Sequence, residues 1–128
     1  MSAMSDYLEN KVLDHALGTS AYTHPSQAYL GLSTGSLGDD ASGTELSGNN
    51  YSRVSINFDA ASGGTTDNSA AVEFAAATGT WGTISHFGIY DASSSGNLLI
   101  HGAFSASKTI TTGDILRISA GDIDITAA

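Results

Sequence analysis

The segment WGTISHFGIY, residues Trp81 to Tyr90, is the most β-like part of the chain. Side chains of a strand alternate between its two faces, so a period of two predicts which residues share a side. One predicted face carries Trp81, Thr83, Ser85, Phe87 and Ile89, and the other carries Ile84, His86, Gly88 and Tyr90. The segment therefore predicts a long strand that is apolar on much of both sides.

Shorter segments of similar character occur on both sides of this strand. They are separated by turns rich in Gly, Ser, Asn and Asp, which is typical of an antiparallel all-β domain. The predicted strands cover residues 28–33, 53–58, 70–75, 98–104, 108–110, 115–119 and 122–126. We expect an all-β, jelly-roll-like antiparallel β-sandwich of about eight strands with one N-terminal α-helix.

The helix is predicted over Ser5 to Leu17, where Leu8, Val12 and Ala16 recur every fourth residue. Ser5 is the expected N-cap, and Gly18 follows the last turn as a left-handed C-cap would. A helix of this length is marginal alone and needs an apolar cover. The alternatives for the surface that covers the apolar side of this helix are the sheet of its own chain and a neighbouring subunit.

The predicted organisation is a single domain, residues 1–128, with a helical arm over 1–18 and the β-sandwich over 28–126. A long polar loop, residues Gly35 to Asn50, interrupts the strands. Loops of this length are usually functional or mobile. The leading helix and this loop are the two segments expected to reach a neighbouring molecule.

Composition restricts the function classes. The chain has 128 residues, no Cys, and 13 acidic against 4 basic residues, for a net charge of −9. Such a charge repels phosphate backbones and anionic lipid, so neither nucleic acid nor a membrane is an expected partner. The N-terminal sequence does not read as a secretory signal. Charged residues are only 13% of the chain, which suits surfaces buried against other subunits.

Residues capable of catalysis are present but form no recognisable motif. His86 and His101 lie on strands expected to be neighbours, where a metal pair, a buried histidine or a histidine cluster at a symmetry axis are all possible. Two acidic pairs have two possible interpretations each, as calcium ligands or as solvated carboxylates. They are Asp39 with Asp40, and Asp122 with Asp124. The spacing Gly-x-Ser-x-Gly occurs at residues 31–35 (GLSTG), but this segment ends a predicted strand and no helix is predicted after it, so the strand–turn–helix frame of a nucleophile elbow is missing. We therefore predict no catalytic residues, no metal site and no cofactor.

Aromatic residues divide into two predicted groups. Trp81 and the phenylalanines suit a sandwich core better than a sugar-binding platform, although Trp81 is retained as a contact candidate. The tyrosines combine an apolar ring with a polar tip and suit a surface or interface. The candidate interface residues are Tyr7, Leu8, Val12, His15, Tyr22, Asp39, Asp40, Tyr51, Trp81, His86 and His101.

Motifs along almost the whole chain resemble a known family. They are YLENKVLDHALG (7–18), AYLGLSTG (28–35), GTELSGNNYSRVSINF (43–58), VEFAAATGTWGTISHFGIYDA (72–92) and GNLLIHGAFSASKTITTGDILRISAGDIDI (96–125). The sequence resembles the small phage virion proteins commonly labelled phage tail fibre proteins, whose relatives include capsid-decorating chains. This resemblance implies a virion component that is not an enzyme.

Within that family we expect a capsid cement protein, placed on the capsid surface, that bridges adjacent subunits of the major capsid protein. A homo-trimer, or else a homo-dimer, is the expected assembly. The first alternative is a tail-fibre or tail-tip module that binds a host receptor or glycan. The second alternative is an enzyme such as a small glycan hydrolase.

Overall fold

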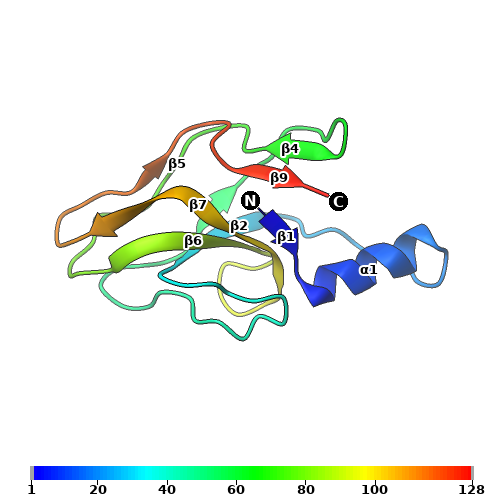
Figure 1. Ribbon diagram of the computed structural model, residues 1–128, viewed down its shortest axis with the longest axis horizontal. Coiled ribbons are helices and arrows are strands. Elements are labelled where there is room, and N and C mark those ends of the chain that lie inside the picture. Colours follow the sequence, from blue (N-terminus) through cyan, green and yellow to red (C-terminus); the bar gives the residue numbers. More distant parts are fainter. Residues whose placement is uncertain (1, 128) are drawn as a thin grey trace.

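The computed structural model describes residues 2–127, and residues 1 and 128 of the predicted domain lie outside the described residues. Its centre is an antiparallel hairpin of β6 (Gly82–Tyr90) and β7 (Leu98–Ile110) (Figure 1). The strand predicted over 81–90 is confirmed. The separate strands predicted over 98–104 and 108–110 are one continuous strand.

The predicted alternation along β6 is wrong at Ile84. The pairing of β6 with β7 shifts register between Ile84, which pairs with Lys108, and His86, which pairs with Ala103, so one residue of β6 lies opposite four residues of β7. Such a bulge reverses the alternation beyond it. Ile84 consequently packs in the core together with Phe87 and Ile89, whereas a regular strand would place it on the opposite face.

Three further strands extend this hairpin into a five-stranded sheet, in the order β1-β7-β6-β2-β3. β2 (Ala28–Ser33) has the predicted bounds, and β3 (Val54–Ile56) lies inside the predicted 53–58. β1 (Ser2–Met4) pairs with β7, with Ala3 opposite His101. The expectation of a helical arm over 1–18 is therefore wrong for residues 2–4, which form an edge strand. Three residues are too few to show a period in the sequence.

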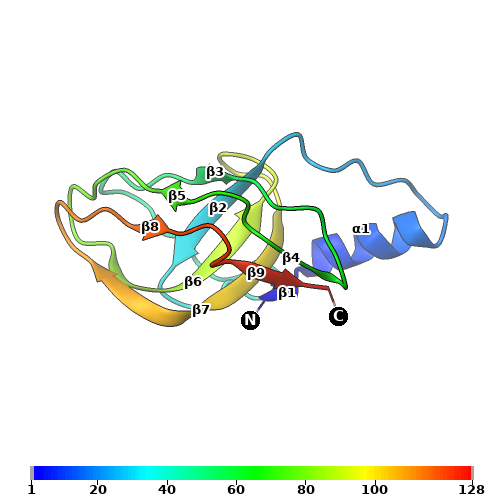
Figure 2. The same ribbon diagram turned by 90° about the horizontal axis from the view of Figure 1, so that it is seen from above.

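The second layer consists of two antiparallel strand pairs. One pair is β4 (Thr65–Asp67) with β9 (Asp124–Thr126), and the other is β5 (Val72–Glu73) with β8 (Arg117–Ile118). Figure 2 shows these strands lying over one face of the large sheet. β4 is not among the predicted strands, because TTD carries no apolar alternation.

The core lies between the two layers. Leu30, Leu32 and Phe87 from the large sheet pack in one buried cluster with Ile118 and Ile123 from the second layer. The all-β antiparallel sandwich with one N-terminal helix is confirmed. Its thickness is set by side chains from both layers, as in other face-to-face sheet packings.

The long loop between β2 and β3 is packed against its own sheet. Leu37 is buried and forms a second apolar cluster with Tyr90 and Leu98 on the other side of the hairpin. Hydrogen bonds tie the loop to β2, among them those from the Leu46 N–H to the Leu32 carbonyl (3.0 Å) and from Ser33 Oγ to the Thr44 carbonyl (2.8 Å). The loop is therefore a structural covering for one face of the sheet.

The helix α1 (Asp6–Ala16) projects away from the sandwich at one end, followed by a returning segment that leads to β2 (Figures 1 and 2). Within residues 2–127, no helix combines the length and apolar character needed to cross a bilayer.

Candidate interaction surface

The arm, defined as α1 with the returning segment to residue 27, is built from local signals that the sequence displays. Ser5 is the N-cap, and its Oγ accepts a hydrogen bond from the Leu8 N–H at 3.2 Å. Asp6 and Glu9 lie in the first turn, where acidic groups interact favourably with the helix dipole. Gly18 has a φ of +82°, the left-handed conformation expected just beyond a helix end. The predicted helix and both of its caps are confirmed.

The root of the arm is fixed to the sheet. The buried Ser5 donates its hydroxyl to the Leu98 carbonyl (2.5 Å) and its N–H to the Leu99 carbonyl (2.8 Å). The Asp6 N–H donates to the Asp39 carbonyl at 2.8 Å. These bonds set the direction in which α1 leaves the sandwich.

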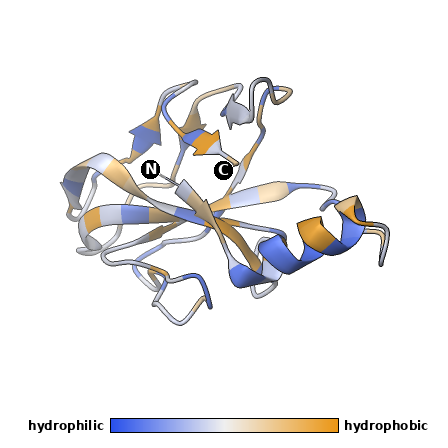
Figure 3. Ribbon diagram, turned by 45° about the vertical axis from the view of Figure 1, so that its right-hand side comes forward, coloured by the Kyte–Doolittle hydropathy of each residue, from blue (hydrophilic) through white to orange (hydrophobic). Residues whose placement is uncertain are grey.

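Beyond this root, residues 2–127 leave the apolar side of α1 largely exposed to solvent. No residue of the helix is buried, and the exposed fractions are 40% for Val12, 56% for Leu13 and 77% for Leu17. Figure 3 shows the hydrophobic colour on the outer part of the helix. The interpretation in which the helix covers its own sheet is therefore wrong, and a neighbouring molecule as cover stays a prediction.

Three of the predicted interface residues hold the arm together. The Tyr22 N–H donates to His15 Nδ1 at 3.1 Å, which ties the returning segment to the last turn of α1. Partial burial raises the pKa of Tyr22, and the neighbouring Tyr7 and Asp91 raise it further. Lys11 Nζ lies 5.6 Å from the centre of the Tyr7 ring, within cation–π range. Tyr7 and Leu8 are half-buried at the base of the helix.

Asp39 and Asp40 lie next to this root, but they are arranged differently. Asp39 Oδ1 is 2.7 Å from His101 Nε2, and most of the Asp39 carboxylate is exposed. Hydrogen bonds from the Ser42 side chain and N–H lower the pKa of Asp40. Within residues 2–127, no three His, Asp or Glu side chains converge as metal ligands. The two carboxylates therefore act here as hydrogen-bond acceptors.

His86 and His101 share one face of the β6–β7 hairpin. Their cross-strand partners are Ala103 and Gly88, so the two rings are diagonal neighbours, and both line one shallow depression. His86 Nδ1 lies 2.7 Å from Ser85 Oγ. The expected proximity of the two histidines is confirmed, and their place at a symmetry axis stays a prediction.

The structure places Tyr51 and Trp81, two of the predicted contact residues, against the core of their own chain. Trp81 is only 6% exposed, and its ring centre lies 5.5 Å from that of Tyr51 and 6.2 Å from that of Phe74. Its Nε1 donates to the Asn49 carbonyl at 2.9 Å. Trp81 is buried and Tyr51 is partly buried because the end of the long loop folds back over the sandwich, which alternation within one strand does not reveal.

Sequence reasoning missed a polar cluster that fastens this loop. Arg53 Nη2 is 2.8 Å from Glu45 Oε1, with exposed side-chain fractions of 8% and 21% respectively, and the guanidinium lies 3.5 Å from the centre of the Tyr90 ring. Tyr51 donates its hydroxyl to Glu45 at 2.5 Å. A Cβ on Gly31 would lie 2.7 Å from Glu45 Oε2, so the glycine leaves room for the pair. A lone Gly inside the apolar strand AYLGLS was the available signal.

Burial changes the ionisation of the two tyrosines in this cluster. Burial raises the pKa of Tyr90 to about 12, with a further contribution from the negative charge of Glu45. Burial and the hydrogen bond to Glu45 raise the pKa of Tyr51 as well. Both phenols are therefore neutral at physiological pH, and the cluster carries one balanced pair of charges.

The family model described as "Podophage GP4 fiber I protein gp80" matches residues 3–126. The chain belongs to this family. No curated protein matches it significantly. The family is one of phage fibre proteins, which supports a structural role in the virion and confirms the resemblance seen in the sequence. The match spans both the arm and the sandwich.

Proposed function

We propose that this protein is a non-catalytic structural subunit of the phage fibre apparatus that binds neighbouring virion proteins through its N-terminal arm. One observation carries the proposal, namely that a rigidly rooted helix presents Val12, Leu13 and Leu17 to solvent. Apolar side chains exposed together on one short element are characteristic of protein interaction sites. The printed family name supports the assignment to a fibre.

The internal position of Trp81 and Tyr51 also supports adhesion by the arm. An exposed aromatic platform was the feature that would have favoured glycan binding by the sandwich. Trp81 is instead buried in the core with Phe74, and the partly buried Tyr51 packs against both rings. The exposed apolar side chains of the arm remain as the strongest candidates for a binding surface, and the partner they suit is another protein.

The test is incorporation into particles. Phage carrying the double substitution Leu13→Ser and Leu17→Ser should incorporate much less of the protein than wild-type phage, measured by quantitative mass spectrometry of purified particles. Ile115→Ser is the matched control, because Ile115 is also a large exposed apolar residue, at 55%, but lies on the sandwich. Equal incorporation of the arm variant and wild type would reject the arm as the attachment element.

A second candidate is a capsid cement protein that bridges subunits of the major capsid protein. The observation that favours it is the compact sandwich itself, because the sequence contains no repeats from which a long shaft would be built. Cryo-electron microscopy of intact particles separates the two candidates. Density for the sandwich on a fibre supports the first, density between capsid subunits supports the second, and absence from mature particles overturns both.

A further inference from the structure

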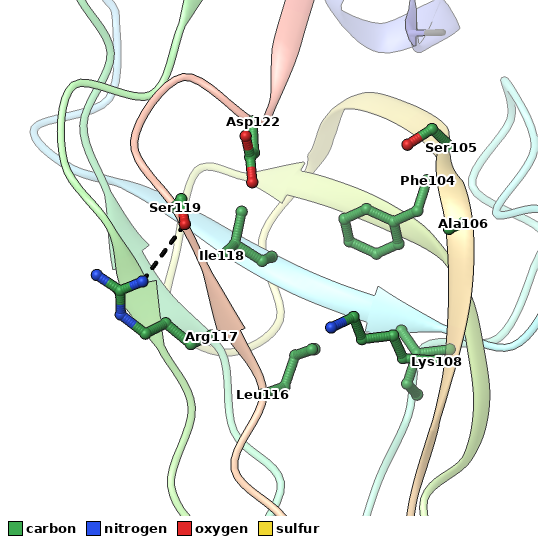
Figure 4. A pocket seen from close by; sticks show the side chains of 10 residues that line it. Phe104, Ser105, Ala106, Lys108, Leu116, Arg117, Ile118, Ser119 and Asp122 are labelled. Atoms are coloured by element: carbon green, nitrogen blue, oxygen red, sulfur yellow. Dashed lines mark hydrogen bonds between the residues drawn. The ribbon is translucent and has the colours of Figure 1, made fainter.

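A depression on the surface of the sandwich, which we name the β7–β8 groove, combines apolar side chains with the basic residues Lys108 and Arg117. It lies between β7 and the chain leading through β8, and Figure 4 shows its side chains. The residues that define it are Ile84, Phe104, Lys108, Leu116, Ile118 and Asp122. Its volume of 280 Å³ is below the range of about 300–1,000 Å³ usual for small-molecule pockets. This size suits one or two protruding apolar side chains.

The groove contains two of the few basic residues of the chain, together with one acidic residue, Asp122. The chain has only four Lys and Arg residues. Lys11 is on the arm and Arg53 is paired with Glu45, while Lys108 and Arg117 both line the groove. Among residues 2–127, neither Lys108 nor Arg117 forms an ion pair. Figure 4 shows Lys108 reaching across the opening and Arg117 directed to its outer edge, where it donates to Ser119.

The arm has a complementary surface. Glu9 precedes Val12 by three residues and Leu13 by four, so these three side chains are neighbours on one side of α1. Glu9 is exposed, as are both apolar residues. The stretch from Glu9 to Leu17 is about 12 Å long as a helix. The β7 wall of the groove, Phe104 to Lys108, is about 13 Å long as a strand.

The two surfaces cannot meet within one chain. Figure 2 shows α1 and β8 at opposite ends of the molecule. The hydrogen bonds of Ser5 to the Leu98 and Leu99 carbonyls fix the root of the arm at its own end. The groove is therefore accessible only to the arm of another molecule.

We propose that the β7–β8 groove binds α1 of a second copy of this chain, with Val12 and Leu13 inserted over Ile118 and Phe104 and with Glu9 paired to Lys108. This inference rests on the proposed function and names the partner of the arm. The contact is head-to-tail, so each molecule donates one arm and receives another. Two chains of charge −9 repel each other at long range, and the Glu9–Lys108 pair supplies a local attraction that fixes the register.

Charge reversal provides the test. Sedimentation velocity of the purified full-length chain, over a wide range of concentration, should show reversible association. Lys108→Glu and Glu9→Lys should each weaken association by about tenfold or more, which corresponds to about 1.4 kcal/mol. The double variant Glu9→Lys with Lys108→Glu should recover most of the wild-type affinity, because the pair is restored with its signs exchanged.

Two controls keep the result specific. Lys11→Glu reverses a charge on the other side of α1, beside Tyr7, and should leave association close to that of wild type after allowance for net charge. Thermal unfolding followed by circular dichroism should show that every variant retains the fold. A wild-type chain that stays monomeric, or a double variant as weak as either single variant, would overturn the inference.

Failure of the docking between copies and failure of the proposed function give different experimental results. A chain that is monomeric in solution but is still incorporated into particles through its arm overturns self-docking alone, and it assigns the arm to a different virion protein. A chain that self-associates as described but is absent from mature particles overturns the proposed function alone.

Discussion

The long loop between β2 and β3 and the N-terminal arm both extend from the sandwich. They differ in the exposure of their apolar side chains, which the loop buries and the arm leaves in solvent. The loop buries Leu37 against Tyr90 and Leu98, and its end covers Trp81. The arm leaves Leu13 and Leu17 in solvent. A polar, glycine-rich excursion can therefore be part of the core, whereas a regular helix with good caps can remain without cover. A segment can bind a partner through those apolar side chains that its own chain leaves exposed.

Trp81→Ala should have the largest effect, because it removes the ring on which the end of the loop packs. Truncation of a buried aromatic residue costs about 3–5 kcal/mol, which is a large part of the stability of a small domain. Urea unfolding monitored by circular dichroism measures the loss. A cost below about 1 kcal/mol would show that the loop is only loosely attached and would remove the contrast with the arm.

Glu45→Ala should cause the second-largest loss of unfolding free energy. It leaves Arg53 largely buried without its carboxylate and removes the acceptor of the Tyr51 hydroxyl. Breaking a buried ion pair by deleting one partner costs about 3 kcal/mol. The matched comparison is Glu73→Ala, an exposed acid on β5, which should change the unfolding free energy by less than about 0.5 kcal/mol. Equal costs for the two variants would contradict the anchoring role of the cluster.

Alkaline pH should loosen the attachment of the loop through Tyr90. A tyrosine whose folded-state pKa is raised binds its proton more tightly in the native state, so its contribution is complete below about pH 10 and is lost as pH rises through the folded-state pKa. For Tyr90 that window is from about pH 10 to about 12. The expected loss at pH 12 is on the order of 2 kcal/mol. Unfolding free energies measured across this range should decline, and Tyr90→Phe should flatten the decline; an unchanged decline would contradict this assignment.

Leu17→Ser should have the smallest effect on the isolated chain. Its side chain is 77% exposed, so the unfolding free energy at low protein concentration should change by less than about 0.5 kcal/mol. Urea unfolding of dilute protein is the measurement. A cost above about 2 kcal/mol would mean that the arm is covered by its own chain, and the distinction between arm and loop would then be wrong.

The parts of the fold that were predicted from sequence depend on local patterns. The helix was predicted with its caps because Ser5 and Gly18 act within one turn of its ends. β2 was predicted with its bounds because glycine and polar segments flank a clear apolar run. The short β1 and β4 were missed, since three residues show no period and owe their conformation to pairing partners far along the chain.

The candidate site was predicted only in part, for a related reason. Val12 and Leu13 were visible as one side of a helix, but whether that side is covered depends on where β1 directs the arm. Trp81 was assigned to two alternatives because its cover comes from Asn49 and Tyr51, more than 25 residues earlier. Lys108 was not selected, since its lack of an ion-pair partner is visible only when β7 and β8 are side by side.

The position of the arm and the β7–β8 groove at opposite ends of the molecule has a consequence for polymer growth. A contact between unlike surfaces propagates until the array closes into a ring, and otherwise it continues as a filament. Growth of such an array is polar, with an accepting tip and a donating tip that are chemically distinct. A chain whose arm is disabled would act as a terminator: it could join at one tip only, and a small proportion of it would shorten every assembly in a mixture.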